Sequence, residues 1–95
     1  MKTFQAEILT PQKVFFSGPV EALVLKGASG YFGVLAGHAP LIARLAPGRL
    51  KLVRDGKESF YQAGAGFAQV SPPATLGAAL GAGKERVSVL LDDIK

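Results

Sequence analysis

Hydrophobic and polar residues alternate along most of this chain with a period of two, which is typical of half-buried β-strands rather than of helices. The alternation is clearest at residues 4–8 and 86–91. Turn residues separate the alternating runs at short intervals, as in an all-β sandwich or flattened barrel. Eight or nine short strands are predicted, at residues 4–8, 14–16 with 20–25, 31–35, 41–45, 49–54, 57–62, 65–70 and 86–91.

Glycine and proline pairs predict how these strands are joined. Asp55-Gly56 is typical of a type I′ hairpin turn, and Pro47-Gly48 predicts a turn between two strands. Gly18-Pro19 predicts a bulge or bend inside the second extended run. Beyond that bend, we expect Val20, Ala22 and Val24 to lie on one face and Leu23 and Leu25 on the other.

Residues 72–85 break the alternation, since they begin with two prolines and are mostly small and rich in glycine. We expect an inserted loop there, with a short helical turn near residues 76–80, inside a single domain that spans residues 1–95. The run Gly81-Ala82-Gly83-Lys84 is not a phosphate-binding loop, because Ala78 and Glu85 stand where that motif needs glycine and a hydroxyl residue.

The positive charge is local. Residues 44–57 hold five basic residues and one acidic residue, which accounts for the whole net charge of +4. Because these charges alternate with apolar residues such as Leu50 and Leu52, they indicate the solvated face of a strand. The neighbouring aromatic residues Phe60, Tyr61 and Phe67 leave a single-stranded nucleic-acid binder as an alternative. We expect Phe60 and Phe67 to point inward, with Tyr61 accessible.

The chain offers little for catalysis or for binding a metal or cofactor. It has no cysteine, and its one histidine, His38, lies between Gly37 and Ala39, which supply neither an orienting carboxylate nor a nucleophile. Asp92 and Asp93 are adjacent on an expected strand end, so their side chains diverge. We therefore predict no catalytic site, no metal and no cofactor. The amino terminus has no apolar run typical of a signal peptide, and no segment is long enough for a membrane helix, so membrane association would come only through partners.

Glycines are densest in the segment 27–37, where four of eleven residues are glycine. That density predicts tight loops around a short strand, with positive φ or close backbone approach at the glycines. Pro40 then fixes the backbone at the start of the next strand. Such a rigid edge of small residues suits contact with another protein.

This segment also carries a family resemblance. Residues 30–41, which read Gly-Tyr-Phe-Gly-Val-Leu-Ala-Gly-His-Ala-Pro-Leu, closely resemble the ε subunit of F-type ATP synthase, called δ in mitochondria. Four flanking stretches agree in order and spacing: Phe16-Ser17-Gly18 with Val20-Glu21, Leu45-Ala46-Pro47-Gly48, residues 64–70 and residues 87–92. The resemblance covers nearly the whole chain apart from residues 72–85.

The resemblance implies a flattened antiparallel β-sandwich of ten strands. It implies a non-catalytic rotor subunit of the central stalk, which docks on the γ subunit and the c-ring and couples proton flow to ATP synthesis. Its place would be the cytoplasmic face of the bacterial plasma membrane, peripheral in the F1 sector, with no nucleic acid as partner. Many family members continue into a helical hairpin that inhibits ATP hydrolysis and in some bacteria binds ATP. A chain complete at Lys95 is expected to do neither.

Site residues follow from the resemblance by position. Contacts to the c-ring are expected at Ser29, Gly30 and Tyr31, and contacts to γ at Thr10, His38 and Ala43. The residues implied to shape this surface are Gly27, Gly33, Gly37 and Pro40. Many relatives are acidic around the first group, where this chain carries no charge, and Ala43 replaces a polar residue. The ring contact is therefore expected to use the aromatic area and the hydroxyl of Tyr31 rather than charge.

Overall fold

The computed structural model describes residues 3–37, 40–71 and 86–95, and strands occupy most of them. The nine strands are β1 (Phe4–Leu9), β2 (Val14–Val20), β3 (Ala22–Gly27), β4 (Gly30–Leu35), β5 (Leu41–Leu45), β6 (Gly48–Arg54), β7 (Lys57–Ala63), β8 (Gly66–Ser71) and β9 (Arg86–Leu91). The all-β prediction is confirmed, with nine strands in the described residues where the family resemblance implied ten. The loop predicted at residues 72–85 and its helical turn lie outside the described residues.

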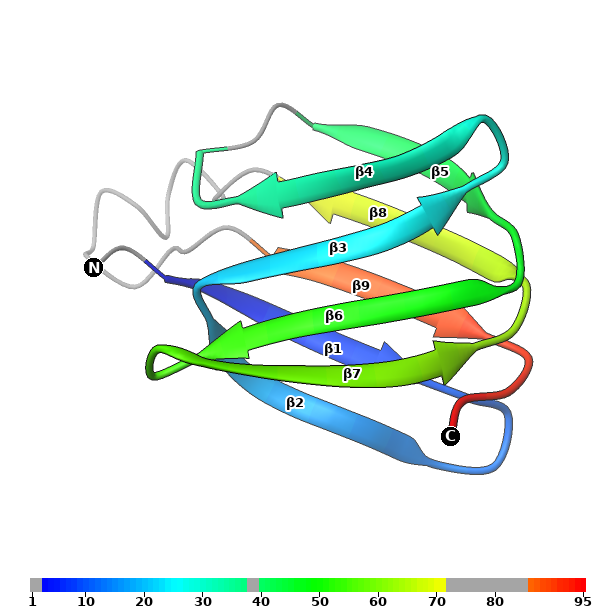
Figure 1. Cartoon of the computed structure of the whole chain (residues 1–95), viewed down its shortest axis with the longest axis horizontal. Coiled ribbons are helices and arrows are strands. Elements are labelled where there is room, and N and C mark those ends of the chain that lie inside the picture. The colour runs from blue at the N-terminus through cyan, green and yellow to red at the C-terminus, as the bar shows by residue number, and fades with distance from the viewer. Residues whose placement is uncertain (1–2, 38–39, 72–85) are drawn as a thin grey trace.

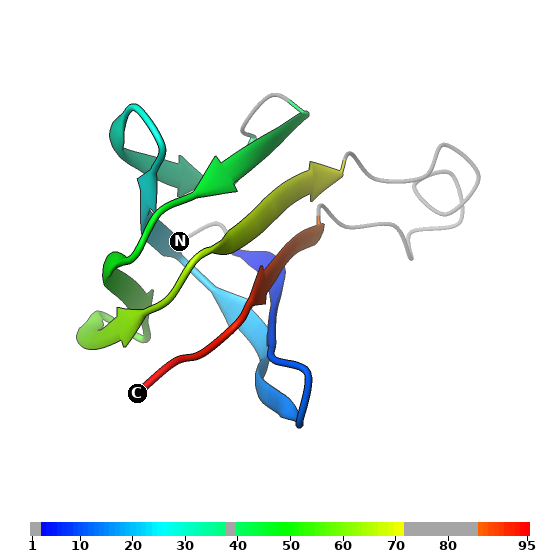
Figure 2. The same ribbon diagram turned by 90° about the vertical axis from the view of Figure 1, so that its right-hand side faces the viewer.

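The strands form one strongly curled sheet that folds into two layers (Figures 1 and 2). One layer has the order β2-β1-β9-β8-β5, and the other has the order β4-β3-β6-β7. The layers join at a corner where Gly27 of β3 pairs with Leu45 of β5. Strand β1 runs parallel to β9, and the other pairs are antiparallel. The parallel pair departs from the fully antiparallel sandwich, and it arises because the last strand lies between β1 and β8.

The core lies between the layers and is built by the alternation seen in the sequence. In β1 every second side chain is buried, and β9 repeats the pattern. The buried hydrophobic residues form one cluster, and the described residues include no buried polar or charged residue. Burial of this apolar surface is the main source of stability in so small a domain.

The layers are tied together along the side opposite the β3–β5 corner. The ring of Phe15 in β2 meets the ring of Tyr61 in β7 edge to face, with 5.1 Å between centroids. The guanidinium of Arg54 lies 5.4 Å from the centroid of the Phe16 ring. Near the end of β7, the backbone of Gln62 exchanges two hydrogen bonds of 2.9 Å with Lys95. These contacts join β2 to β6 and β7, and join β7 to the residues that follow β9.

The hairpin predicted at Asp55-Gly56 is confirmed. Both residues have positive φ, 53° and 73°, as a type I′ turn requires. The carboxylate of Glu21 also accepts a hydrogen bond from the Gly56 amide at 2.7 Å. Local sequence therefore sets this turn, and a distant side chain reinforces it.

The predicted bend at Gly18-Pro19 is wrong, because β2 continues through both residues in regular register. The irregularity lies nearer its start, where Phe15 is the extra residue opposite the Ile8–Leu9 step. The face assignment beyond it is also corrected. Val20 is buried with Leu23 and Leu25, because the chain passes from one layer to the other at Glu21, between β2 and β3.

The orientations predicted for the aromatic residues are reversed. Phe60 and Phe67 are 53% and 51% exposed, whereas Tyr61 packs against the core. Register explains the difference, since Tyr61 pairs with the buried Leu50 while Phe60 pairs with the outward Lys51. In β8 the inward position belongs to Ala68 rather than to Phe67.

Candidate docking surface

The glycine-rich segment forms the β3–β4 hairpin and its exposed tip, Ala28-Ser29. Gly27 allows a close approach there, because an added Cβ would lie 2.9 Å from the Gly30 carbonyl oxygen and 3.1 Å from the ring of Phe32. Gly30 itself has a φ of +137°, a conformation that side-chain-bearing residues rarely adopt. The sequence thus folds into a tight, rigid tip that projects small residues.

Tyr31 lies at the start of β4 with its ring 56% exposed. Its hydroxyl oxygen accepts a hydrogen bond from the Arg49 amide at 3.3 Å, and the Nζ of Lys26 lies 5.1 Å from the centroid of its ring. Gly48 leaves room for this arrangement, since a Cβ there would lie 2.7 Å from the Lys26 side chain and 3.2 Å from the Tyr31 hydroxyl. The tyrosine is therefore held in place while one side of its ring faces outward.

A groove of about 410 Å³ joins this hairpin to β5. Its lining residues are Gly27, Ala28, Ser29, Gly30, Tyr31, Phe32, Ala43 and Arg44. The structure thus brings the three residues expected at the c-ring into one hollow with Ala43, which was expected at γ. Arg44 is the charged residue of this lining, and no acidic residue belongs to it.

The other expected contact residues lie around this groove. Thr10 follows β1 and closes a turn in which its amide donates to the Lys13 carbonyl at 2.9 Å. Leu9 aligns across β9 and β8 with Arg44 of β5, so Thr10 lies about three strand spacings, roughly 14 Å, from the Ala43 end of the groove. His38 lies outside the described residues.

Gly33, Gly37 and Pro40, the other residues expected to shape this surface, differ in backbone conformation. Gly37 has a φ of +89°, and Pro40 directly precedes β5 on the surface. Gly33 has ordinary strand geometry, and the nearest atom to an added Cβ would be the Leu23 carbonyl oxygen at 3.9 Å. Neither backbone conformation nor crowding therefore demands a glycine at Gly33.

An apolar row that was not predicted from the sequence lies on the outer face of the five-stranded layer. Val14, Leu9, Leu90 and Phe67 align across β2, β1, β9 and β8, and Arg44 continues the row in β5. Three of the four apolar residues are at least half exposed. One signal for this row is the adjacent pair Leu90-Leu91, since two neighbouring apolar residues in a strand must face opposite sides. The row runs from the Thr10 end of β1 to the groove.

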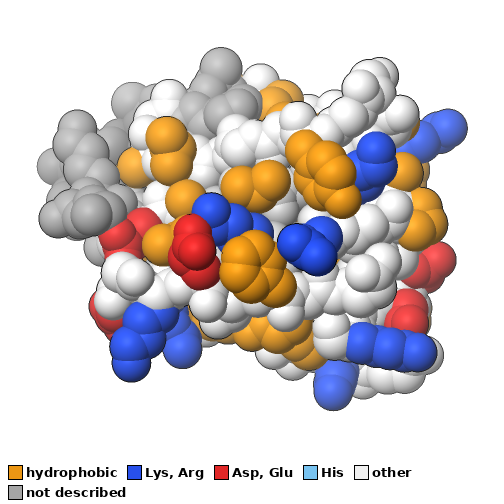
Figure 3. All heavy atoms as spheres, in the orientation of Figure 1, with side chains coloured by type: hydrophobic (Ala, Val, Ile, Leu, Met, Phe, Trp, Pro, Cys, Tyr) orange, Lys and Arg blue, Asp and Glu red, His pale blue; other side chains and the backbone are white. Residues whose placement is uncertain are grey.

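The outer face of the other layer mixes aromatic and basic side chains, and Figure 3 views it directly. The guanidinium of Arg49 lies 5.5 Å from the centroid of the Phe60 ring. Lys51 is not free, because its Nζ lies 2.6 Å from a carboxylate oxygen of Glu58. Alternation of Leu50 and Leu52 with the charged residues makes this the solvated face that the sequence predicted.

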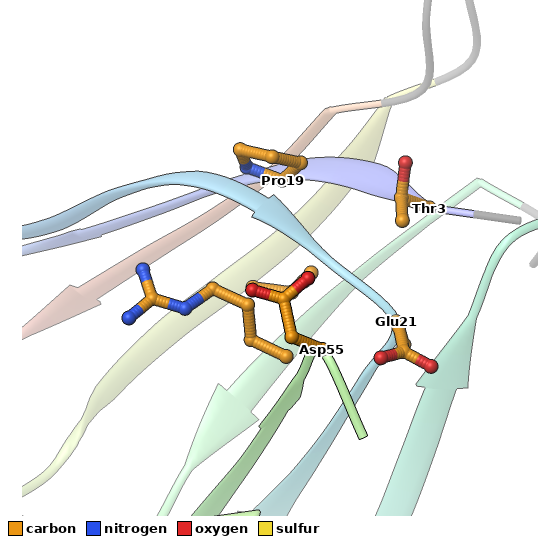
Figure 4. A pocket seen from close by; sticks show the side chains of 6 residues that line it. Thr3, Pro19, Glu21 and Asp55 are labelled. Atoms are coloured by element: carbon orange, nitrogen blue, oxygen red, sulfur yellow. The ribbon is translucent and has the colours of Figure 1, made fainter. Parts of the chain in front are cut away.

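A second hollow, of about 430 Å³, lies at the other end of the molecule beside the β6–β7 hairpin (Figure 4). It is lined by Thr3, Pro19, Val20, Glu21, Arg54 and Asp55. Glu21 is already engaged with the Gly56 amide, and Arg54 with the ring of Phe16. These side chains therefore support the hairpin and the β2 edge.

The described residues hold no cluster of three His, Cys, Asp or Glu side chains that could ligate a metal. Every buried side-chain nitrogen or oxygen among them has a hydrogen-bond partner. In the same part of the chain, no helix is long and apolar enough to cross a membrane. The features that could contact another molecule are the hairpin tip, the groove and the exposed apolar row.

Comparison with known proteins identifies the family of this chain. Residues 3–94 match the family described as the β-sandwich domain of the ATP synthase delta/epsilon chain. The ATP synthase epsilon chain of Chromohalobacter salexigens is 42% identical over 73 residues, which are 76% of this chain and 52% of that protein. The epsilon chain of Chlorobaculum tepidum is 45% identical over 71 residues, which are 74% of this chain and 81% of that protein. The chain therefore spans about half the length of the first of these relatives.

Solved structures give the same fold. A chain of the Euglena gracilis mitochondrial ATP synthase, in a structure of its OSCP, F1 and c-ring, superposes with a TM-score of 0.79 at 25% identity, covering 98% of this chain and 52% of that one. A chain of the Tetrahymena thermophila mitochondrial enzyme, in a structure of its central stalk and c-ring, has a TM-score of 0.72 at 16% identity, covering 99% and 66%. The second likeness shows the fold alone.

Proposed function

Because this chain belongs to the β-sandwich family of ATP synthase delta and epsilon chains, we propose that it is a non-catalytic rotor subunit of the central stalk, which docks on the γ subunit and the c-ring. The membership bears out the resemblance carried by residues 30–41. In this role the domain couples proton flow to ATP synthesis without a reaction of its own. It sits at the membrane through its partners, in the F1 sector on the cytoplasmic face of the bacterial plasma membrane.

The observation that carries the proposal is the groove between the β3–β4 hairpin and β5. It gathers Ser29, Gly30 and Tyr31, the residues assigned to the c-ring, beside Ala43, which is assigned to γ. Two partners that contact this one corner of a stiff sandwich would have to turn together. The close-packed core between the layers supports this, because a compliant joint would loosen the coupling.

The contact to the ring is apolar and aromatic in character. The hairpin tip carries no acidic residue, and the charged side chains near it are basic: Lys26 beside the Tyr31 ring and Arg44 in the groove lining. The half-exposed ring of Tyr31 supplies contact area, and its position is fixed before binding. A pre-positioned aromatic side chain loses little conformational entropy on binding, which favours it as an anchor.

The contact to γ extends from the groove along the exposed apolar row. Thr10 directly follows Leu9 of that row, and Ala43 directly precedes Arg44, with Leu90 and Phe67 between the two positions. His38, which precedes β5 closely in sequence, belongs to the same assigned surface. An apolar strip of this kind, rimmed by Arg44, has the composition of a protein interface.

Separate binding measurements with the γ subunit and the detergent-solubilised c-ring test this proposal. Tyr31→Ser is expected to weaken binding to the c-ring about tenfold with less effect on γ, and His38→Ala is expected to do the reverse. Phe60→Ser is the matched control, because Phe60 is about as exposed as Tyr31 but lies on β7, away from the groove. Wild-type protein that binds neither partner would refute the assignment.

One observation favours a second candidate function, a small barrel that binds single-stranded nucleic acid. Phe60 is exposed beside Arg49, and base stacking uses such pairs. Against it, Phe67 faces outward on the opposite layer, so the two aromatic residues form no shared platform. Oligonucleotide binding at low salt that falls steeply with salt would support it, and no binding at low salt would remove it.

A further inference from the structure

Strands β2, β7 and β4 lie at edges of the curled sheet, and two of them are protected. Strand β2 carries Pro19 and an irregular register at Phe15, both of which hinder pairing with another strand. Strand β7 begins with Lys57-Glu58, and its far end is covered by backbone hydrogen bonds to Lys95. Soluble proteins use such devices to prevent an open edge from recruiting strands.

Strand β4 has none of these devices. Its sequence, Gly-Tyr-Phe-Gly-Val-Leu, contains no charge and no proline, and its register with β3 is regular throughout. Within the described residues it pairs only with β3. Its outward side chains include Tyr31 and Leu35, which is 62% exposed. An apolar edge that no other described strand covers favours pairing with another extended segment.

The register shows which backbone groups are open. Gly27 and Gly30 close the two-residue turn, and hydrogen-bonded pairs alternate along an antiparallel ladder. The amides and carbonyls of Phe32 and Val34 therefore face β3. Those of Tyr31, Gly33 and Leu35 face away from it, toward the open edge.

Side chains near this edge define the chemistry of the segment that would fit. Gly33 lies between Tyr31 and Leu35 on the outward face and leaves a notch, since the nearest atom to an added Cβ, the Leu23 carbonyl oxygen, would be 3.9 Å away. A large apolar side chain on an added strand fills such a notch next to an edge glycine. Arg44 lines the groove that begins beside β4, so a carboxylate on the same segment would be attracted there.

We propose that the free edge of β4 accepts an extended segment of the γ subunit as an added strand, with an apolar side chain over Gly33 and a carboxylate near Arg44. The inference rests on the proposed function and specifies how that docking occurs. Main-chain hydrogen bonds would supply affinity, and the notch and Arg44 would select the segment. Tyr31 and Phe32 of β4 line the same groove as Ala43, which is assigned to γ, and this favours γ as the occupant.

Amide hydrogen exchange of the full chain, measured alone and with saturating γ subunit, tests the pairing directly. We expect exchange to slow at least tenfold at Tyr31, Gly33 and Leu35. The amides of Phe32 and Val34, already bonded to β3, provide an internal control and should change much less. Binding of γ without protection at the first three amides would overturn this inference and leave the proposed function standing. No binding at all would overturn both.

Variants test the side-chain part. Gly33→Val fills the notch at a position with ordinary strand geometry, where the nearest atom to the new Cβ is 3.9 Å away, so the variant should keep its fold and bind γ about tenfold more weakly. Leu35→Lys adds an edge-blocking charge and should weaken binding similarly. The matched control is Phe60→Lys, a similar change on the β7 edge. Thermal melts of the free variants establish that each one folds.

Two results would contradict the proposal. Equal losses in Leu35→Lys and Phe60→Lys would mean that added charge, rather than the β4 edge, weakens binding. Protection of the β4 amides in the chain alone, rising with its concentration, would identify a second copy as the occupant in place of γ. Sedimentation velocity over the same concentrations distinguishes that case.

Discussion

Replacing Gly66 by alanine should destabilise this domain strongly, for a reason visible only in the folded sheet. Gly66 begins β8, where it pairs with Leu91 of β9 on one side and Leu45 of β5 on the other. An added Cβ would lie 2.8 Å from the carbonyl carbon and closer still to the carbonyl oxygen of Leu90, and 3.0 Å from the Cα of Leu91. These are backbone atoms, so no side-chain rotation relieves the clash.

The expected magnitude follows from what must move. Overpacking a close-packed site costs about 1–3 kcal/mol. Separating β8 from β9 here also weakens neighbouring ladder hydrogen bonds, including the 2.9 Å bond from the Asp92 amide to the Ala65 carbonyl, at about 1 kcal/mol each. We therefore expect a loss of about 3 kcal/mol in the free energy of unfolding. For a domain of this size that corresponds to a fall in Tm of roughly 12–24 °C.

Gly33→Ala is the matched control, because it makes the same chemical change where there is room. The nearest atom to the new Cβ would be 3.9 Å away, and φ at Gly33 lies outside the left-handed region. Restricting the unfolded chain should then stabilise the domain by about 0.5 kcal/mol. Urea and thermal unfolding followed by far-ultraviolet circular dichroism measure both variants. A Gly66→Ala protein within 0.5 kcal/mol of wild type would refute the steric argument.

Three further predictions use the same unfolding assays. Gly56→Ala should cost about 1 kcal/mol, because φ at Gly56 is +73°, and a loss below 0.3 kcal/mol would contradict the turn assignment. Glu58→Gln breaks the ion pair with Lys51, yet should change the free energy of unfolding by less than about 0.5 kcal/mol, because both side chains are partly exposed. A loss above about 1.5 kcal/mol would show that the ion pair is stronger than its exposure suggests. Ile8→Val should cost about 1 kcal/mol and Ile8→Ala about 3 kcal/mol, since Ile8 is fully buried in β1; similar values for the two variants would mean that the core refills the cavity.

Local signals in the sequence identified the β-strands well. The strands at 41–45 and 86–91 have the predicted bounds, and the Asp55-Gly56 turn has the predicted geometry. Both depend on neighbouring residues, through side-chain alternation and positive φ. Gly18-Pro19 did not have the effect predicted from local sequence. Strand β2 lies at the edge of the sheet, where proline, which lacks an amide hydrogen, is tolerated without a bend.

The candidate site was predicted only in parts. The resemblance supplied Ser29 to Tyr31 and Ala43 as separate contacts, and the structure joins them in one groove because β3 and β5 meet at Gly27 and Leu45. The exposed apolar row was missed, since Val14, Leu9, Leu90 and Phe67 align only through register across four strands. The unprotected edge of β4 was also invisible, because a strand becomes an edge only when the order of the sheet is known.

By itself, the sequence determined the all-β class and the family of this protein, because each depends on composition or on residues near one another in the chain. Alternation predicted the buried face of β1 and β9, and tertiary structure decided it where apolar residues are adjacent, as in β7. Phe60 and Tyr61 are adjacent aromatic residues, and the sequence alone does not show which of them packs against the core. The pairing of Tyr61 with the buried Leu50 places Tyr61 on the inner face. A shift of one residue would exchange them, so pairing with a neighbouring strand, rather than the hydrophobicity of either side chain, sets the surface that a partner meets.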